Sequence, residues 1–276
     1  MLEITLCNEL MAEDGLSLAQ QAEVARELGY CGLELAPATL GKEPHRLDAT
    51  QVTEIRRTVE DAGLRVTGLH WLLSGYPAAS ITDRACWADT REILIGLVGL
   101  CAALGGEILI HGSPGQRVRP KGMDDAALIA CLAEFFAPVA KAAERAGVTY
   151  CIEPLAQMET DTITTVAEGA ALVDAIASRA FRTMIDCKAV GLQEPPVADC
   201  IRTWLPTGAV THVHANDTNL GAPGMGDDPF HDIMQALIDN QWQGQIGVEP
   251  FRTVVDAKVT AAIGIATLRA HERHAR

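Results

Sequence analysis

The sequence predicts a (β/α)8 (TIM) barrel, and we expect it to form a single domain over residues 1–276. Short, nearly continuous apolar runs alternate with helical patterns along the whole chain, giving eight strand–helix units. The length of 276 residues is close to the size typical of an α/β barrel. No linker or break in composition divides the chain. A doubly wound sheet is the alternative fold, but it explains eight regular units less well.

The expected strands are apolar along nearly their whole length, as in a parallel sheet covered by helices. In chain order they are Glu3–Cys7, Gly32–Ala36, Arg65–Trp71, Glu107–His111, Thr149–Glu153, Arg182–Asp186, Val210–His214 and Gln245–Glu249. Each strand is about the length of a typical strand in a globular protein.

A stretch with helical periodicity follows each of these strands. The expected helices are Ser17–Leu28, Asp48–Ala62, Thr82–Leu104, Asp124–Ala146, Thr162–Ala177, Pro196–Trp204, His231–Asn240 and Asp256–Ala275. Ser17, Asp48 and Thr82 are residue types that cap helix N-termini. Glycines that suit a helix C-terminus follow four helical stretches, at Gly29, Gly63, Gly105 and Gly147.

Composition excludes several classes of function. A formal net charge of −14 argues against nucleic acid, which needs a cluster of Lys and Arg, and disfavours an anionic membrane as partner. We find no secretion signal and no long uninterrupted apolar stretch, so we expect a cytoplasmic protein. The eight cysteines show no metal-binding spacing and are expected to be reduced, although Cys7 and Cys187 fall at predicted strand ends and could line a pocket.

Four residues that bind hard divalent metals lie at the ends of separate apolar runs. They are Glu153, Asp186, His214 and Glu249, at intervals of 33, 28 and 35 residues. Each interval fits one strand, one helix and two loops, and the C-terminal ends of barrel strands converge on one active site. One such carboxylate would more often cap a helix or pair with an Arg. Four at equivalent strand ends predict a site for Mn²⁺, Mg²⁺, Co²⁺ or Zn²⁺.

This set of residues suits proton chemistry beside a carbonyl group. A divalent ion held by two Glu, one Asp and one His keeps positions open for substrate oxygens and can stabilise an enediolate. Glu153 and Glu249 are predicted to lie on different sides of the barrel mouth. Either could remove a proton from the carbon beside the carbonyl while the other returns one.

Three motifs resemble a known family. They are IEPL at 152–155 with Glu159 following, HVHAND at 212–217 followed by GAPGMG at 221–226, and VEPF at 248–251. Over essentially the whole chain, the sequence resembles the xylose isomerase-like (sugar phosphate isomerase/epimerase) barrels. That group includes D-tagatose 3-epimerase type enzymes, inosose dehydratase and endonuclease IV.

The resemblance to the epimerase branch implies a role for each matching residue. Metal ligands are implied at Glu153, Asp186, His214 and Glu249, with the two Glu also acting as the acid/base pair. Contact with substrate hydroxyls is implied for Glu159. A (β/α)8 fold, one divalent ion and a small sugar substrate are implied for the protein as a whole.

The chain departs from the epimerase pattern at two positions. Ala189 stands where these epimerases have a His, three residues after the strand-6 Asp. The segment Thr218–Leu220 stands where they have an Arg shortly after the HxH motif. Both family residues contact the sugar. Endonuclease IV needs many more His residues for three zinc ions, so DNA repair is poorly supported.

Other residues could replace the missing sugar contacts. Lys188 would point into the barrel mouth beside Asp186 if strand 6 continues that far; the alternative is a surface salt bridge. The loop after strand 4, HGSPGQR, is expected to bring His111 and Arg117 to the same mouth. Two cations at one site would suit an anionic substrate. His70 ends predicted strand 3, where a pocket wall and a core position are equally consistent.

We therefore expect an enzyme of carbohydrate metabolism, a metal-dependent isomerase or epimerase of a keto-sugar or sugar acid. The alternative is a lyase of the same fold, either a decarboxylase of a 3-oxo sugar acid such as 3-oxo-isoapionate or a keto-polyol dehydratase. A third possibility is a barrel that has lost its metal and only binds ligands. The expected partner is a small sugar or sugar acid, with no nucleic acid and no membrane, and the chain could form a homo-oligomer.

Overall fold

The computed structural model describes residues 1–193 and 196–275, and within them eight parallel strands close into a barrel. The strands are β1 Glu3–Cys7, β2 Gly32–Leu35, β3 Arg65–Leu69, β4 Ile108–His111, β5 Thr149–Ile152, β6 Phe181–Asp186, β7 Val210–Ala215 and β8 Gln245–Val248. Each strand pairs with its neighbour in sequence, and β1 pairs with β8 to close the ring. The predicted fold class is confirmed.

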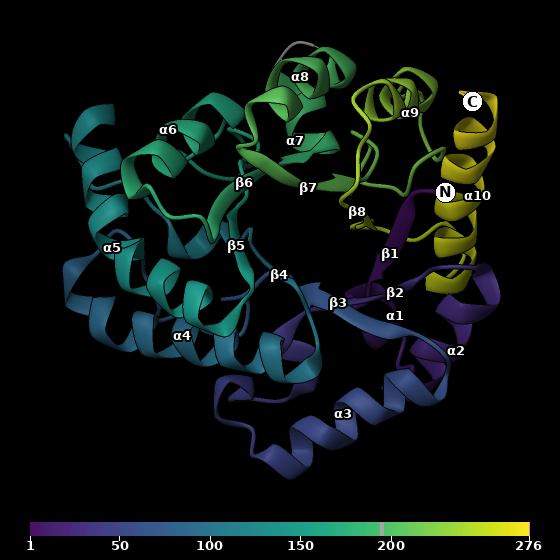
Figure 1. Cartoon of the computed structure of the whole chain (residues 1–276), viewed down its shortest axis with the longest axis horizontal. Helices are drawn as coiled ribbons and strands as arrows, with labels where there is room; N and C mark the ends of the chain where they lie inside the picture. Colours follow the sequence, from purple (N-terminus) through teal and green to yellow (C-terminus); the bar gives the residue numbers. More distant parts are fainter. Residues whose placement is uncertain (194–195, 276) are drawn as a thin grey trace.

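Helices surround the barrel (Figure 1). They are α1 Glu9–Glu13, α2 Leu18–Leu28, α3 Ala49–Asp61, α4 Trp87–Leu104, α5 Asp125–Ala146, α6 Val166–Ile176, α7 Cys187–Gln193, α8 Val197–Trp204, α9 Phe230–Asp239 and α10 Ala257–His274. The last helix returns to the first strand, where Glu272 accepts a hydrogen bond from the Leu2 backbone N–H at 2.7 Å.

Local sequence signals explain several helix boundaries. Ser17 and Asp48 each form a capping box with the Gln three residues later, which satisfies N–H groups that the first helical turn leaves free. Gly29 ends α2 in the left-handed conformation, with φ of 91°, which glycine adopts without steric penalty. The expectation for Thr82 is wrong: α4 begins at Trp87, after a short 3-10 turn capped by Asp83.

Four strands end earlier than predicted, and three of these changes affect the site. β2 ends at Leu35, β3 at Leu69, β5 at Ile152 and β8 at Val248, so His70, Glu153 and Glu249 each lie just beyond a strand. The chain also turns into α7 directly after β6, at Cys187. His70, Glu153 and Glu249 consequently stand on the rim of the barrel, and the backbone N–H of each still donates to a carbonyl at the end of the neighbouring strand.

The core has two layers. A small cluster of Ile108, Ile110, Cys151 and Met184 belongs to inward-facing positions of β4, β5 and β6. A much larger cluster packs the outer faces of the strands against the helices. The apolar helix α5 is long enough to cross a bilayer, but half of its most apolar window is buried within the protein.

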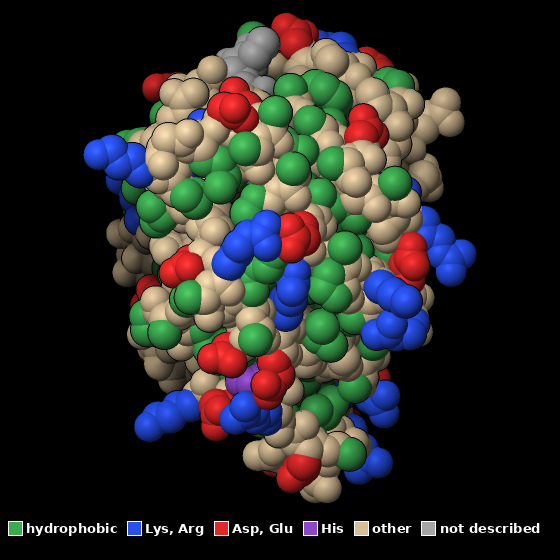
Figure 2. All heavy atoms as spheres, turned by 90° about the vertical axis from the view of Figure 1, so that its left-hand side faces the viewer, with side chains coloured by type: hydrophobic (Ala, Val, Ile, Leu, Met, Phe, Trp, Pro, Cys, Tyr) green, Lys and Arg blue, Asp and Glu red, His purple; other side chains and the backbone are tan. Residues whose placement is uncertain are grey.

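The outer surface carries both signs of charge. On the face around α5, Lys and Arg side chains alternate with Asp and Glu, with hydrophobic side chains scattered between them (Figure 2). This face has no continuous basic patch of the kind that binds a nucleic-acid backbone.

Candidate metal centre and active site

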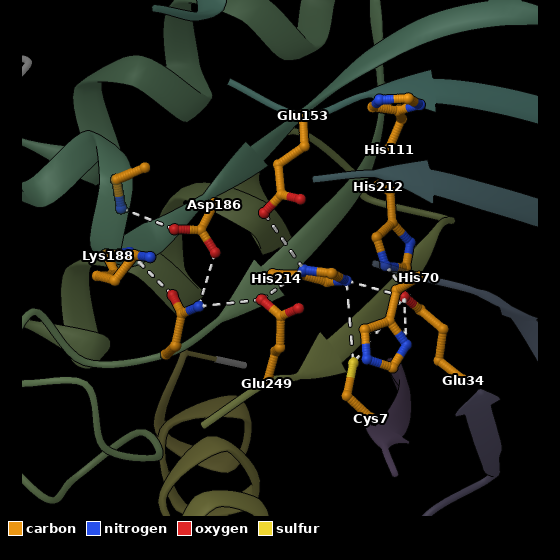
Figure 3. Close-up of polar contacts among 12 residues, drawn as sticks. Cys7, Glu34, His70, His111, Glu153, Asp186, Lys188, His212, His214 and Glu249 are labelled. Atoms are coloured by element: carbon orange, nitrogen blue, oxygen red, sulfur yellow. Dashed lines mark hydrogen bonds and ion pairs between the residues drawn. The ribbon is translucent and has the colours of Figure 1, made fainter. Parts of the chain in front are cut away.

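The four predicted ligands converge at the C-terminal end of the barrel (Figure 3). Glu153, Asp186, His214 and Glu249 each offer one ligand atom, and these atoms all lie within 4.8 Å of one another. All four residues are buried. Side chains that are distant in sequence meet because parallel strands end at the same rim of the barrel.

The histidine lies between two carboxylates. Its Nδ1 atom is 3.0 Å from Glu249 Oε2 and 3.8 Å from Glu153 Oε1. Within the described residues this Nδ1 forms no hydrogen bond of acceptable geometry, so its lone pair is available to a ligand in the centre of the group. One imidazole nitrogen and three carboxylates form a donor set that suits a divalent metal ion.

Hydrogen bonds hold the carboxylates of Asp186 and Glu249 in place. The Asn216 side chain donates to Asp186 Oδ2 at 2.6 Å and to Glu249 Oε2 at 3.5 Å. The Ala189 backbone N–H donates to Asp186 Oδ1 at 2.7 Å. Ala189, which stands where the epimerase pattern has a His, therefore supports the candidate ligand Asp186 through its backbone N–H.

The electrostatics of the group also fit a cation. Burial, opposed by His214 and reinforced by the charge of Glu153, raises the pKa of Glu249 to about 7. Burial likewise raises the pKa of Asp186 above its ordinary value, although Lys188 lowers it. Carboxylates crowded in a buried site resist ionising together, and a divalent ion would relieve that repulsion.

A glycine makes room for one ligand. A Cβ atom added at Gly112, in the loop after β4, would lie 1.8 Å from Glu153 Oε2. Such a contact is impossible, so the position of the Glu153 carboxylate depends on the absence of a side chain at residue 112.

The structure places Lys188 at the mouth, but not on a strand. It lies in the first turn of α7 with its side chain almost fully buried. Its Nζ is 2.8 Å from Glu159 Oε1 and 4.2 Å from the centre of the Phe251 ring. Burial alone would lower the pKa of Lys188, but Asp186 and Glu159 hold it well above the ordinary value. Lys188 and Glu159 thus form a closed ion pair beside the metal centre.

The predicted role of Arg117 as an anion clamp is not supported by its contacts. The guanidinium is fully buried and donates to the backbone carbonyl of Glu153 at 2.7 Å and to that of His111. Burial lowers its pKa to about 10. Arg117 therefore joins the ends of β4 and β5 and is not directed at a substrate.

The predicted substrate contact by His111 is likewise not supported. Alternation along β4 turns Ile108 and Ile110 into the barrel and His111 outward, against Phe136 of α5. Its Nδ1 is 2.6 Å from the Tyr150 hydroxyl. Burial, followed by the charge of Arg117, keeps its pKa well below the ordinary value.

His70 joins a buried cluster next to the metal centre. Its Nε2 is 2.6 Å from Glu9 Oε2, and its ring meets the His214 ring edge-on with 6.2 Å between ring centres. Its Nδ1 lies 3.9 Å from Glu34 Oε1. The His70 side chain has no exposed surface and its ring lies against the candidate ligand His214, and its contact with substrate stays a prediction.

The position of Glu34 near the end of the second strand allows it to line the pocket, but the sequence gives it no role, which the structure supplies. Glu34 lies between the outward-facing Leu33 and Leu35 of β2 and is fully buried inside the barrel. It contacts both His212 and His214. Cys7 does line this cluster, with its Sγ 4.0 Å from His214 Nε2, whereas Cys187 packs in the apolar core.

Three known proteins show the degree of similarity of this chain to characterised sequences and structures. The D-psicose 3-epimerase of Agrobacterium fabrum is 34% identical over 41% of this chain, a match that spans only 38% of that enzyme. The L-ribulose 3-epimerase of Mesorhizobium japonicum is 28% identical over 76% of this chain and 70% of that enzyme. The structure of a 3-keto-D-glucoside 4-epimerase from E. coli superposes with a TM-score of 0.83 and 17% identity, covering 98% of this chain and 100% of that one.

A family profile described as the xylose isomerase-like TIM barrel matches residues 22–271. That match covers all the candidate site residues. The chain therefore belongs to the xylose isomerase-like TIM-barrel family.

Proposed function

We propose that the protein is a divalent-metal-dependent epimerase or isomerase of a keto-sugar that works through an enediolate. The observation that carries this proposal is the convergence of Glu153 and Glu249 on one buried group with Asp186 and His214. Relatives named as ketose 3-epimerases support the sugar class.

These four residues would hold the ion, which when bound supplies Lewis-acid stabilisation to the oxygens of the enediolate. The chain's own carboxylates perform the proton transfers. Glu153 and Glu249 come from strands β5 and β8, which are not neighbours in the barrel, so they approach the centre from different directions. One carboxylate removes the proton beside the carbonyl and the other returns a proton on the opposite face, which inverts that carbon.

The surrounding charges favour a neutral polyol over a sugar acid. Arg117 is engaged by backbone carbonyls, and Lys188 is already paired with Glu159. Arg117 is therefore directed away from a substrate carboxylate, and the charge of Lys188 is already balanced by Glu159. Glu159 is the more exposed member of the pair, and we propose that its carboxylate accepts hydrogen bonds from substrate hydroxyls while Lys188 holds it in place.

At the two positions where the chain departs from the epimerase pattern, the residues present form hydrogen bonds through their backbone. Ala189 supports Asp186, and the carbonyl of Leu220 accepts hydrogen bonds from the backbone N–H groups of Phe251 and Arg252 at 2.8 and 3.1 Å. The sugar contacts made by a His and an Arg in epimerases are therefore absent at these positions. We propose a keto-sugar whose distal hydroxyls are recognised differently, with Phe251 as a wall of the mouth.

The lyase alternative loses its main support. It was motivated by two cations available for a carboxylate, and both are engaged elsewhere. The buried metal group would serve a lyase equally well, so the test below separates the two outcomes by their products.

Solvent-proton exchange tests the proposal. The Mn²⁺-loaded protein is incubated in D₂O with D-fructose, D-psicose, D-tagatose and L-ribulose, and deuterium beside the carbonyl is followed by NMR. Incorporation is expected for at least one ketose and is expected to disappear in Glu153→Gln and Glu249→Gln. The exposed Glu92→Gln is the matched control, and the metal content of every variant is measured. Exchange retained in both site variants would refute the acid/base assignment, and CO₂ or enone formation from a 3-oxo acid would favour a lyase.

A further inference from the structure

We propose that Glu34 is a positioning residue for the metal centre: it holds the Nε2 side of His214 so that Nδ1 faces the metal. This inference rests on the proposed metal centre. Glu34 lies on β2, which only β1 separates from β8 in the closed barrel, and it is not one of the four candidate ligands.

One carboxylate contacts both histidines of the HxH motif and forms a hydrogen bond with the second. Glu34 Oε1 is 2.9 Å from His214 Nε2 in that hydrogen bond, whereas the 3.0 Å contact between Oε2 and His212 Nε2 lacks hydrogen-bond geometry. The two rings meet edge-on, with 5.0 Å between their centres and 79° between their planes. Figure 3 shows this arrangement, with His214 between Glu34 on one side and the metal group on the other.

This contact determines which nitrogen can bind a metal. A neutral imidazole carries its hydrogen on one ring nitrogen and a lone pair on the other. Because Nε2 faces a carboxylate, the hydrogen belongs there, and the lone pair of Nδ1 is directed toward Glu153 and Glu249. A carboxylate bound to the far nitrogen also orients the ring and makes it a stronger ligand.

Among the described residues, Glu34 has two further neighbours besides these histidines. They are the Cys7 thiol, at 3.9 Å, and His70 Nδ1, at 3.9 Å. A carboxylate with no exposed surface needs hydrogen-bond donors, so the position of Glu34 depends on the histidines around it.

The neighbouring strand is shaped around this arrangement. A Cβ at Gly247 of β8 would lie 2.9 Å from His214 Cδ2 and 3.3 Å from both Glu34 Oε2 and His212 Nε2. Glycine at this inward position leaves space for all three side chains. The first His of the HxH motif thus acts as a support for Glu34, and only the second is a metal ligand.

Metal affinity tests the proposal directly. Glu34→Gln keeps the shape of the side chain but removes its charge and leaves only one oxygen able to accept a hydrogen bond. Glu272→Gln is the matched control. Glu272 is also buried, but it lies near the C-terminus of α10, where it binds the Leu2 backbone N–H that precedes β1. Dissociation constants for Mn²⁺ and Co²⁺ are measured by competition with a chelator, together with the melting temperature of each metal-free variant.

We expect Glu34→Gln to weaken metal binding by about 10- to 100-fold and to change the visible spectrum of bound Co²⁺. Glu272→Gln is expected to keep the wild-type affinity. In the Zn²⁺-loaded wild type, ¹⁵N NMR is expected to show His214 with its hydrogen on Nε2. Wild-type affinity in Glu34→Gln, or a hydrogen on Nδ1, would overturn the proposal.

The outcomes separate this inference from the proposed reaction. If the wild type binds metal but exchanges no ketose proton, the proposed function fails while a weakened Glu34→Gln still supports the positioning role. If the wild type exchanges protons and Glu34→Gln binds metal normally, only the positioning role fails. Absence of metal binding by the wild type would overturn the positioning role along with the metal centre.

Discussion

Gly112→Ala is the substitution whose effect on the metal centre follows most directly from the geometry. The added Cβ would lie 1.8 Å from Glu153 Oε2 and 2.9 Å from Glu153 Cδ. The φ angle of Gly112 is outside the left-handed region, so alanine itself adds no backbone strain there. The clash is with the end of a flexible side chain, which can move without unfolding the protein.

The size of the effect follows from that distance. Ordinary non-bonded contacts begin at about 3.5 Å, so the Glu153 oxygen must move by roughly 1.7 Å. Metal–carboxylate bonds tolerate only about 0.2 Å of displacement. We expect metal affinity to fall by at least about 100-fold, equivalent to about 2.8 kcal/mol of binding free energy. The metal-free protein should melt within a few degrees of the wild type.

The assay is chelator competition with Mn²⁺, combined with thermal unfolding of the metal-free protein. Gly115→Ala is the control, because it lies in the same loop and an added Cβ there meets nothing within 4 Å. It should bind metal as the wild type does. Unchanged affinity in Gly112→Ala would refute the assignment of Glu153 as a ligand.

Three further predictions concern the ion pair, the titration of the site and a helix cap. Lys188→Met leaves the Glu159 carboxylate without its cation and should lower the free energy of unfolding by about 1–3 kcal/mol. Urea denaturation measures this change, and an unchanged free energy of unfolding would mean that the ion pair does not stabilise the fold. Metal binding must displace protons from His214 and Glu249. Burial would lower the pKa of His214, but Glu249 and Glu34 raise it, and the pKa of Glu249 is raised to about 7. Affinity should therefore rise with pH, most steeply below pH 7, and calorimetry showing no proton release at pH 6 would contradict this. Asp48→Ala removes the cap of α3 and should cost about 1 kcal/mol of stability without changing metal affinity, as chemical denaturation and chelator competition can show.

The order of strands and helices could be predicted because it is written in local patterns. Apolar runs, N-cap residues and glycines act over a few neighbouring residues, so Ser17, Asp48 and Gly29 mark boundaries that the structure confirms. Helix boundaries were predicted less well where tertiary packing sets the residue at which a helix begins. The start of α4 at Trp87 and the turn into α7 at Cys187 depend on contacts that no local pattern specifies.

The same distinction applies to the site. The sequence alone determined that Glu153, Asp186, His214 and Glu249 end successive strand units, and parallel strands bring such ends to one rim. Only the tertiary structure decided which way each other side chain faces. His111 turns outward, Arg117 is held by backbone carbonyls, and Glu34 points inward to His214, because strand register and barrel closure fix these directions. A shift of one residue along a strand reverses the face of every side chain, and a single sequence does not specify that shift.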